Sequence, residues 1–221
     1  MAVEDNYKHI FDLVEIFAQK GIRHAVICPG SRNAPLIIGF GNHPKINIYS
    51  IVDERSAGFI ALGIAEQTAV PAALICTSGT AGLGFAPAVT EAYYQNIPII
   101  VLTANRPPER IDQQDGQTIH QMNMYKDHIK FQCQLPVDFS HPDSLTHCRR
   151  LANEAVNISM SDEKGPVHID IPLREPFYPE TPGAVNFNKN LKIIEPVYGK
   201  YYLRDDQILS LQNDLLKYKR I

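Results

Sequence analysis

The chain has 221 residues, enough for one large domain with a short extension. Hydrophobic residues make up 44% and charged residues 20%, which is typical of a globular protein and unlike a disordered one. The formal net charge of −3 gives no reason to expect nucleic acid or an acidic membrane surface as a partner.

No apolar run approaches the roughly 18 residues that a membrane span requires, and the first ten residues are too polar for a signal peptide. The four cysteines are scattered and form no CxxC pair: Cys28, Cys76, Cys133 and Cys148. Cys28 and Cys76 each end an apolar run, which favours reduced, buried thiols at strand ends, and the scattered spacing argues against a disulfide framework or a zinc site. We therefore expect a cytoplasmic protein.

Helical spacing of apolar residues predicts helices, and short continuous apolar runs predict strands. In chain order the expected helices span 5–20, 34–40, 54–67, 79–94 and 143–160. The expected strands span 24–28, 46–52, 72–76, 97–102, 128–135 and 167–171. Apolar strands that alternate with helices indicate a parallel sheet covered on both faces. The predicted fold is α/β: a doubly wound, mainly parallel six-stranded sheet with helices on both faces.

The regular alternation of apolar strands and helices stops after the last predicted strand. Between residues 174 and 190, Pro176, Pro179 and Pro182 interrupt a stretch without periodicity, which predicts a linker. Residues 205–219 return to a helical repeat of leucine and isoleucine. A single amphipathic helix has nothing of its own to pack against, so we expect it to open a further, truncated domain.

Polar clusters follow the first four predicted strands. They span residues 29–32, 53–55, 77–80 and 103–121. Ligands bind at the carboxyl ends of the strands in an open parallel sheet, so these clusters would line one rim. The first cluster, PGSR, places a glycine turn, a hydroxyl and a guanidinium at a helix N-terminus, which suits an anionic ligand. An ordinary turn with a solvated arginine fits it equally well. The absence of GxxxxGK[ST] and GxGxxG argues against a P-loop or a dinucleotide site.

Two carboxylates, Asp53 and Glu54, begin the third predicted helix. Such a pair usually serves as helix cap and dipole partner. If Asp53 is the cap, Glu54 is free to point into the rim. The 103–121 loop is dense in hydrogen-bonding groups, as long functional loops often are. These groups belong to Asn105, Arg106, Glu109, Arg110, Gln117 and His120. The eight histidines form no HExxH or other tight metal spacing, so no metal site is expected here.

The wording, order and spacing of several segments resemble a known family. These segments are CPGSRNAPL (28–36), VDERSAGFIALGIA (52–65), ICTSGTAGLGFAPAVTEA (75–92), VLTANRPPE (101–109), GQTIHQ (116–121) and GPVHIDIPLREPFY (165–178). Together they resemble the pyrimidine-binding domain of the 2-succinyl-5-enolpyruvyl-6-hydroxy-3-cyclohexene-1-carboxylate synthase family. DERSAGF and SGTA alone would indicate only a thiamine-diphosphate enzyme of the decarboxylase type. PGSR together with TANRPPE and the QTI segment points to this synthase family.

The resemblance implies a domain organisation and an activity. Residues 1–180 would form the pyrimidine-binding domain, and 181–221 a linker with the start of a truncated middle domain. The family uses thiamine diphosphate and Mg²⁺ as a carbon–carbon bond-forming transferase in menaquinone biosynthesis. It decarboxylates 2-oxoglutarate and adds the succinyl unit to isochorismate, which gives the compound in its name and CO₂.

The resemblance also implies what the chain lacks. The family's acidic Gly-Asp-Gly segment with a later asparagine, which holds Mg²⁺ and the diphosphate, does not occur in this sequence. The Mg²⁺ ligands are therefore expected in a missing C-terminal domain. This chain alone is expected to be inactive, and the full-length protein to be a homodimer or homotetramer.

Site residues follow from the same resemblance. Glu54 matches the catalytic glutamate that hydrogen-bonds N1′ of the cofactor's aminopyrimidine ring. The positions that match substrate contacts are Ser31, Arg32, Arg106 and Gln117. Gly30 and Thr80 would shape the wall beside the pyrimidine, although packing explains both residues equally well.

Two other interpretations stay open. The chain could be the pyrimidine-domain subunit of another 2-oxo acid decarboxylase or an acetolactate synthase-like enzyme, which would leave PGSR and TANRPPE unexplained. It could also be a non-catalytic binding module, in which Glu54 is only a helix-start carboxylate. Substrate choice and the effect of Glu54→Gln separate these readings.

Overall fold

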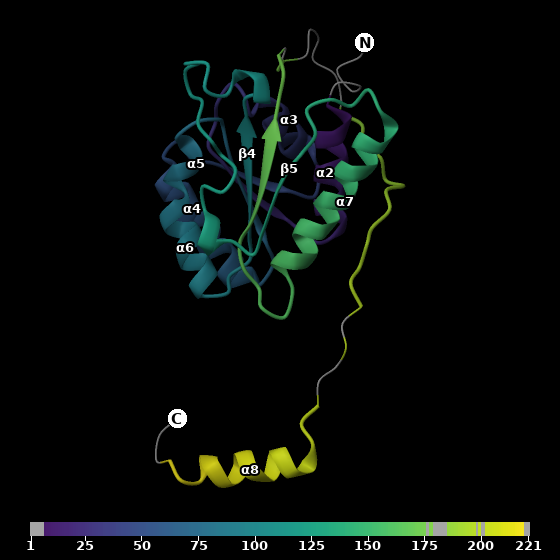
Figure 1. Cartoon of the computed structure of the whole chain (residues 1–221). Helices are drawn as coiled ribbons and strands as arrows, with labels where there is room; N and C mark the ends of the chain where they lie inside the picture. The colour runs from purple at the N-terminus through teal and green to yellow at the C-terminus, as the bar shows by residue number, and fades with distance from the viewer. Residues whose placement is uncertain (1–6, 176, 179–184, 198, 200–201, 219–221) are drawn as a thin grey trace.

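The computed structural model describes residues 7–175, 177–178, 185–197, 199 and 202–218 (Figure 1). The start of the first predicted helix lies outside these residues. So do Pro176, Pro179 and Pro182 of the predicted linker, and its boundary at residue 180.

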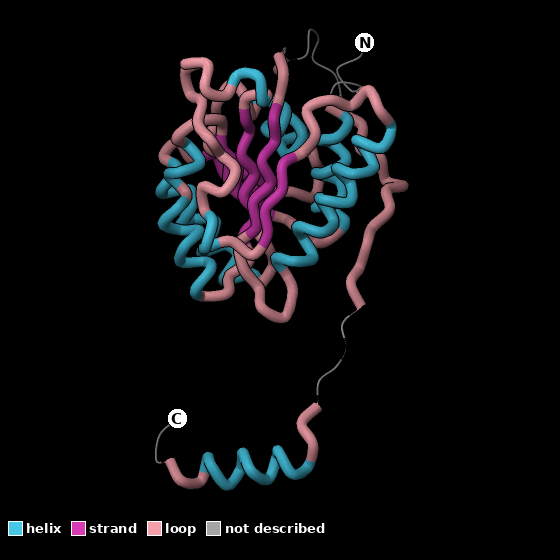
Figure 2. Tube along the Cα trace, viewed as in Figure 1, coloured by secondary structure: helices cyan, strands magenta, loops and turns pink. Residues whose placement is uncertain are grey.

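Six strands form one sheet at the centre of the domain (Figure 2). They are β1 (His24–Ile27), β2 (Asn47–Ser50), β3 (Ala72–Cys76), β4 (Ile99–Asn105), β5 (Phe131–Gln134) and β6 (Val167–Pro172). The strand order is β2-β1-β3-β4-β6-β5, and every neighbouring pair is parallel. The predicted parallel six-stranded sheet is confirmed.

Helices cover both faces of this sheet (Figure 1). One face carries α2 (Lys8–Gln19), α3 (Ala34–Asn42) and α7 (Pro142–Ser159). The other carries α4 (Glu54–Thr68), α5 (Ala81–Gly84) and α6 (Ala86–Tyr94). Residues alternate between the two cores along each strand, so Ile75 faces the first core and Leu74 the second. The doubly wound architecture is therefore confirmed.

Local sequence signals explain where two of the helices begin and end. Asp53 caps α4, because its Oδ1 accepts a hydrogen bond of 2.8 Å from the backbone N–H of Ser56. Gly21 ends α2 with a positive φ of 93°, which lets the Ile22 N–H donate back to the Phe17 carbonyl at 3.0 Å. The Asp53 cap agrees with the sequence-based prediction.

Two predicted elements differ from the structure in ways that bear on the strand ends where ligands bind. The helix expected over 79–94 is divided at Phe85 into α5 and α6, and Gly79 has a non-helical φ of 86°. Pro87 has no N–H to continue a helix from the preceding turn, which favours a fresh start there. Strand β4 runs past its predicted end at 102, and its added polar residues Thr103 and Asn105 bond to Asp170 on β6.

Part of the stretch 181–221, predicted to be a linker and the start of a middle domain, lies against the domain. Leu191 is buried, Lys20 Nζ donates to the Ile194 carbonyl at 3.0 Å, and the Ile194 N–H donates to Asn153 Oδ1 at 2.8 Å. Residues 185–197 thus follow α2 and α7. Helix α8 (Asp205–Leu215) has no buried residue and lies apart from the sheet (Figure 1). None of the described helices is long and apolar enough to cross a membrane.

Candidate functional site

The carboxyl ends of the strands carry two neighbouring pockets. The Glu54 pocket, of about 400 Å³, is lined by Pro29, Gly30, Ser31, Glu54, Thr77, Ser78, Thr80, Ala81 and Gln117. The arginine pocket, of about 480 Å³, is lined by Arg32, Arg106, Pro107, Glu109, Arg110, Asp115, Gly116, Arg174 and Glu175. The pockets meet where Ser31 is followed by Arg32 and Gly116 by Gln117.

Glu54 is half-buried in the first pocket. Because Asp53 serves as the cap, the neighbouring Glu54 side chain is left to line the pocket, as predicted. Gly84 lies directly behind it, since a Cβ at Gly84 would be 2.7 Å from Glu54 Cβ. Within the described part of the chain, the Glu54 carboxyl has no hydrogen bond or ion pair. It is therefore available to a ligand.

Two glycines allow the walls of the Glu54 pocket to approach closely. A Cβ at Gly30 would lie 2.5 Å from Thr77 Cβ, so the turn after β1 touches the end of β3. A Cβ at Gly79 would lie 2.9 Å from the Cα of Gln117, and φ at Gly79 is positive. The Gly79 N–H also donates to Gln121 Oε1 at 2.9 Å. The loop that carries Gln117 is thereby held against the turn after β3.

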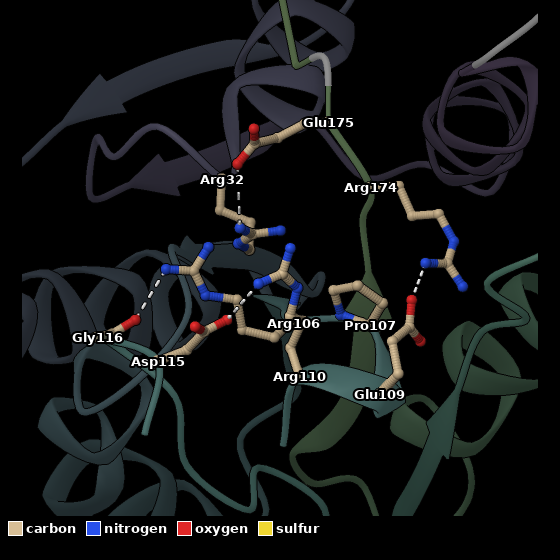
Figure 3. A pocket seen from close by; sticks show the side chains of 9 residues that line it. All are labelled: Arg32, Arg106, Pro107, Glu109, Arg110, Asp115, Gly116, Arg174 and Glu175. Carbon is tan, nitrogen blue, oxygen red and sulfur yellow. Dashed lines mark hydrogen bonds and ion pairs between the residues drawn. The ribbon is translucent and has the colours of Figure 1, made fainter. Parts of the chain in front are cut away.

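Charged side chains converge in the arginine pocket (Figure 3). Arg174 forms an ion pair with Glu109, and Arg110 Nη1 lies 3.5 Å from Asp115 Oδ2. Arg106 Nη2 donates to the Gly116 carbonyl at 2.8 Å. Four arginines thus face three carboxylates, which leaves positive charge available to an anion.

Arg32 is buried, so it is not the solvated arginine that the turn alone allowed. Its Nη1 donates to the Leu173 carbonyl at 2.6 Å, and its Cζ lies 4.6 Å from the Phe177 ring centroid. Its Nη2 lies 3.8 Å from Glu175 Oε1. The Nε atoms of Arg32 and Arg106 are buried without a hydrogen-bond partner among the described residues. Such orphaned donors favour an anionic ligand in this pocket.

The structure divides the predicted site residues between the two pockets. Gly30, Ser31, Glu54, Thr80 and Gln117 line the Glu54 pocket. Arg32 and Arg106 line the arginine pocket.

Two residues of the dense loop, Asn105 and His120, lie outside both pockets, and some lining residues were not predicted from the sequence. His120 is exposed and pairs with Asp112 Oδ1 at 3.0 Å. Arg174 and Glu175, which follow the sixth strand, were not among the predicted site residues. The rule that found the other clusters would have found them, because the carboxyl end of that strand belongs to the same rim.

Cys28 and Cys76 are free, buried thiols at the ends of β1 and β3, as predicted. Burial raises the pKa of Cys28 to about 12, and the nearby carboxylates of Glu54 and Asp53 add to the shift. The thiol is therefore protonated near neutral pH and offers no thiolate to a metal or an electrophile. No group of three or more metal-ligating side chains occurs in the part of the chain that the structure describes.

Residues 10–124 match the family described as thiamine pyrophosphate enzyme, N-terminal TPP binding domain. The chain belongs to this family, whose cofactor is thiamine pyrophosphate, also called thiamine diphosphate.

Particular relatives are more similar still. The chain is 50% identical over 212 residues to 2-succinyl-5-enolpyruvyl-6-hydroxy-3-cyclohexene-1-carboxylate synthase of Cytophaga hutchinsonii. The matched region covers 96% of this chain and 38% of that relative. Proteins of the same name from Christiangramia forsetii and Flavobacterium johnsoniae are 42% and 44% identical over 215 and 202 residues. Each match covers 91% of this chain and 37% or 35% of the relative. The chain thus spans little more than a third of the length of these relatives.

Proposed function

We propose that this chain forms the N-terminal, pyrimidine-binding domain of a thiamine-diphosphate-dependent transferase. The whole enzyme would decarboxylate 2-oxoglutarate and add the succinyl unit to isochorismate, the reaction implied by the name of its relatives. The observation that carries the proposal is the Glu54 carboxyl, which lines a pocket at the strand ends without a protein partner among the described residues.

The residues of the Glu54 pocket fit the aminopyrimidine end of the cofactor. A Cβ at Gly30 would meet Thr77 and one at Gly79 would meet Gln117, so these glycines let the turns that form the pocket wall pack closely around a flat ring. When bound, thiamine diphosphate supplies the chemistry that stabilises the carbanion left by decarboxylation. Glu54 would accept or share a proton at N1′ of the ring, and Thr80 and Gly30 would shape the wall beside it.

The diphosphate and its Mg²⁺ need a different set of ligands. The described residues contain no cluster of carboxylates and histidines that could hold a metal ion. We place the Mg²⁺ ligands in the C-terminal domain of the full-length protein. This assignment explains why the present chain would be inactive by itself.

The arginine pocket fits the substrates. Both 2-oxoglutarate and isochorismate carry two carboxylates, and arginine offers planar, permanently charged donors to such groups. Arg32 and Arg106 each have a buried Nε without a described partner. Ser31 and Gln117 lie where the two pockets meet, so they would contact the substrate beside the cofactor.

An exposed apolar surface beside Glu54 supports assembly into a homodimer or homotetramer. Val52, Phe59, Ile60 and Leu83 are exposed, and Val52 and Leu83 lie within two residues of Glu54 and Gly84. We call these four residues the apolar patch. Contiguous exposed apolar surface marks interaction sites in folded proteins. A second protomer packed on this patch would close the open side of the Glu54 pocket.

The test is CO₂ release by the full-length protein with thiamine diphosphate, Mg²⁺, 2-oxoglutarate and isochorismate. Loss of a proton-transferring group costs about 100-fold or more in rate, so Glu54→Gln should slow turnover by at least that factor. Glu66→Gln is the matched control, because Glu66 lies on the same helix but is exposed and outside both pockets.

Each alternative predicts a different result. Consumption of pyruvate in place of 2-oxoglutarate would keep the cofactor and overturn the substrate assignment. No decarboxylation of any 2-oxo acid would favour a non-catalytic module. Equal rates for wild type and Glu54→Gln would remove Glu54 from the chemistry.

A further inference from the structure

Beneath both pockets, one fully buried carboxylate receives four hydrogen bonds. Asp170 Oδ1 accepts from Thr103 Oγ1 at 3.0 Å and from Gln121 Nε2 at 2.8 Å. Its Oδ2 accepts from Asn105 Nδ2 at 2.8 Å and from Gln134 Nε2 at 2.7 Å. These donors come from β4, from the loop after it and from β5, so Asp170 joins three segments to β6.

All four partners of Asp170 are neutral donors. No lysine or arginine of the described residues forms an ion pair with it. A buried carboxylate without a countercharge is costly unless hydrogen bonds replace its hydration, and here two donors satisfy each oxygen. Because the Thr103 hydroxyl hydrogen points to Asp170, the 2.8 Å contact of Thr103 with His168 Nε2 requires the imidazole to donate.

Gln121 connects this carboxylate to the Glu54 pocket. While its Nε2 donates to Asp170 and to the Ala104 carbonyl at 3.1 Å, its Oε1 accepts from the Gly79 N–H at 2.9 Å. Gly79 forms the turn that carries Ser78 and Thr80 into the pocket wall. The orientation of the Gln121 amide, and hence the acceptor offered to Gly79, is dictated by Asp170, because only the NH₂ end can face a carboxylate.

Asn105 makes the equivalent connection to the arginine pocket. Its Nδ2 donates to Asp170 Oδ2, and its Oδ1 accepts from the Arg106 N–H at 2.7 Å. This bond fixes the backbone where the chain leaves β4 and enters the loop of the arginine pocket.

We propose that Asp170 is a positioning residue that fixes the walls of the two pockets relative to each other. It acts through Gln121 on the turn at Gly79 and through Asn105 on the backbone at Arg106. The structural part of this inference stands on the hydrogen bonds alone. Its consequence for turnover rests on the proposed function. Asp170 itself lines neither pocket, so it touches neither cofactor nor substrate.

Gln134 provides a control within the same network. It donates to Asp170 Oδ2 at 2.7 Å, as Gln121 donates to Oδ1, but it lies on the edge strand β5 and lines neither pocket. Gln121→Met and Gln134→Met each remove one donor to the carboxylate and keep the length of the side chain. Only the first also removes the acceptor for Gly79.

The decisive measurement is amide hydrogen exchange by NMR in the 221-residue chain, read at Gly79 and Arg106. Gln121→Met should speed exchange at Gly79 alone by about tenfold, the effect of losing one buried hydrogen bond. Asn105→Ala should speed exchange at Arg106 alone, Asp170→Asn should speed both, and Gln134→Met should leave both within twofold of wild type. If Asp170→Asn changes neither amide, or Gln134→Met changes both, the inference is overturned.

The four variants keep the test decisive if one of them fails to fold, because the Gly79 amide reports on the connection through Gln121 and the Arg106 amide on the connection through Asn105. In the full-length protein, Gln121→Met should lower kcat/KM for 2-oxoglutarate by about 100-fold, the cost of a small misplacement of reacting groups, while Gln134→Met stays near wild type. If the wild type decarboxylates nothing, the proposed function fails, yet the exchange pattern still decides the positioning role. If Gln121→Met turns over like wild type, the consequence for catalysis is wrong.

Discussion

Buried histidines are the residues of this domain that are most sensitive to acid. His9 is packed against the Phe139 ring at a centroid distance of 4.1 Å, and its Nε2 has no hydrogen-bond partner among the described residues. Burial lowers the pKa of His9 to about 3. Burial also lowers the pKa of His168 to about 4, although the adjacent Asp170 opposes the shift. Tyr125 is the other titratable group that faces the His168 ring. Burial likewise lowers the pKa of His43, which lies beside Glu15.

These shifts predict loss of stability in mild acid. The folded-state pKa of each histidine lies below its ordinary value of about 6.5, so the unfolded chain binds protons that the folded chain excludes. Stability is therefore complete above pH 6.5, and it falls as the pH drops from 6.5 toward 4 by up to about 1.4 kcal/mol per pH unit for each buried histidine. Urea unfolding at a series of pH values measures this slope.

His9→Phe should make the slope shallower, because the phenyl ring can stack on Phe139 and takes up no proton. His147→Gln, which alters an exposed histidine, is the control and should keep the wild-type slope. An unchanged slope in His9→Phe would show that protonation of His9 is not linked to unfolding.

Local interactions made some site residues predictable, and distant ones hid others. Asp53 caps the helix and Glu54 lines the pocket, and these different roles follow from capping, which involves residues only three positions apart. Asp170 lies within an apolar strand pattern, and its partners are between 36 and 67 positions away. Only the assembled sheet brings these groups together. A sequence can show that Asp170 is buried in a strand but not which donors satisfy it.

At the scale of elements, helix α4 packs closely because its inner face is made of small residues. Ala57, Gly58, Ala61 and Ala65 are buried. A Cβ at Gly58 would lie 2.8 Å from Ala88 Cβ on α6, so the two helices touch at this glycine. Apart from the backbone of its own helix, Gly63 has no neighbouring atom within 4 Å of the position where its Cβ would be.

The two glycines of α4 should therefore respond in opposite ways to the same substitution. Gly58→Ala should lower the free energy of unfolding by about 1–3 kcal/mol, because α4 and α6 must separate to accept the methyl group. Gly63→Ala should raise it by up to about 1 kcal/mol, because alanine is the better helix former. Thermal or urea unfolding of the 221-residue chain measures both. A stabilised Gly58→Ala would mean that the helices have room to move apart.

The order and type of the elements could be predicted because the strands are continuous apolar runs, but their ends could not. Strand β2 was expected over 46–52 and spans only Asn47–Ser50, because β1 offers four partners, from His24 to Ile27. Strand β4 extends beyond its apolar run because Thr103 and Asn105 find partners on β6. Strand ends are thus set by pairing, which periodicity in one segment does not reveal.

At the scale of the whole molecule, α4 differs from an ordinary surface helix, whose large apolar residues face the core. Its small residues face the sheet, while the large apolar residues Phe59 and Ile60 face outward. Val52, 83% exposed, and Leu83 extend this apolar patch beside the Glu54 pocket. Sequence alone could not locate the patch, because the apolar pattern of α4 does not say which side meets the sheet. The exposed apolar residues thus flank the pocket that contains Glu54.

The chain should consequently self-associate through the apolar patch, which buries apolar surface that a monomer leaves in water. In sedimentation velocity, the wild-type sedimentation coefficient should rise with protein concentration, and Phe59→Glu should hold it at the monomer value by placing a charge in the contact. Tyr94→Glu is the control, because Tyr94 is also an exposed aromatic residue, at 68% against 47% for Phe59, but lies at the C-terminal end of α6 outside the patch. If both variants associate like wild type, the contact lies elsewhere on the molecule. If only Phe59→Glu stays monomeric, the same surface that flanks Glu54 joins two protomers, which is the arrangement that closes the proposed site.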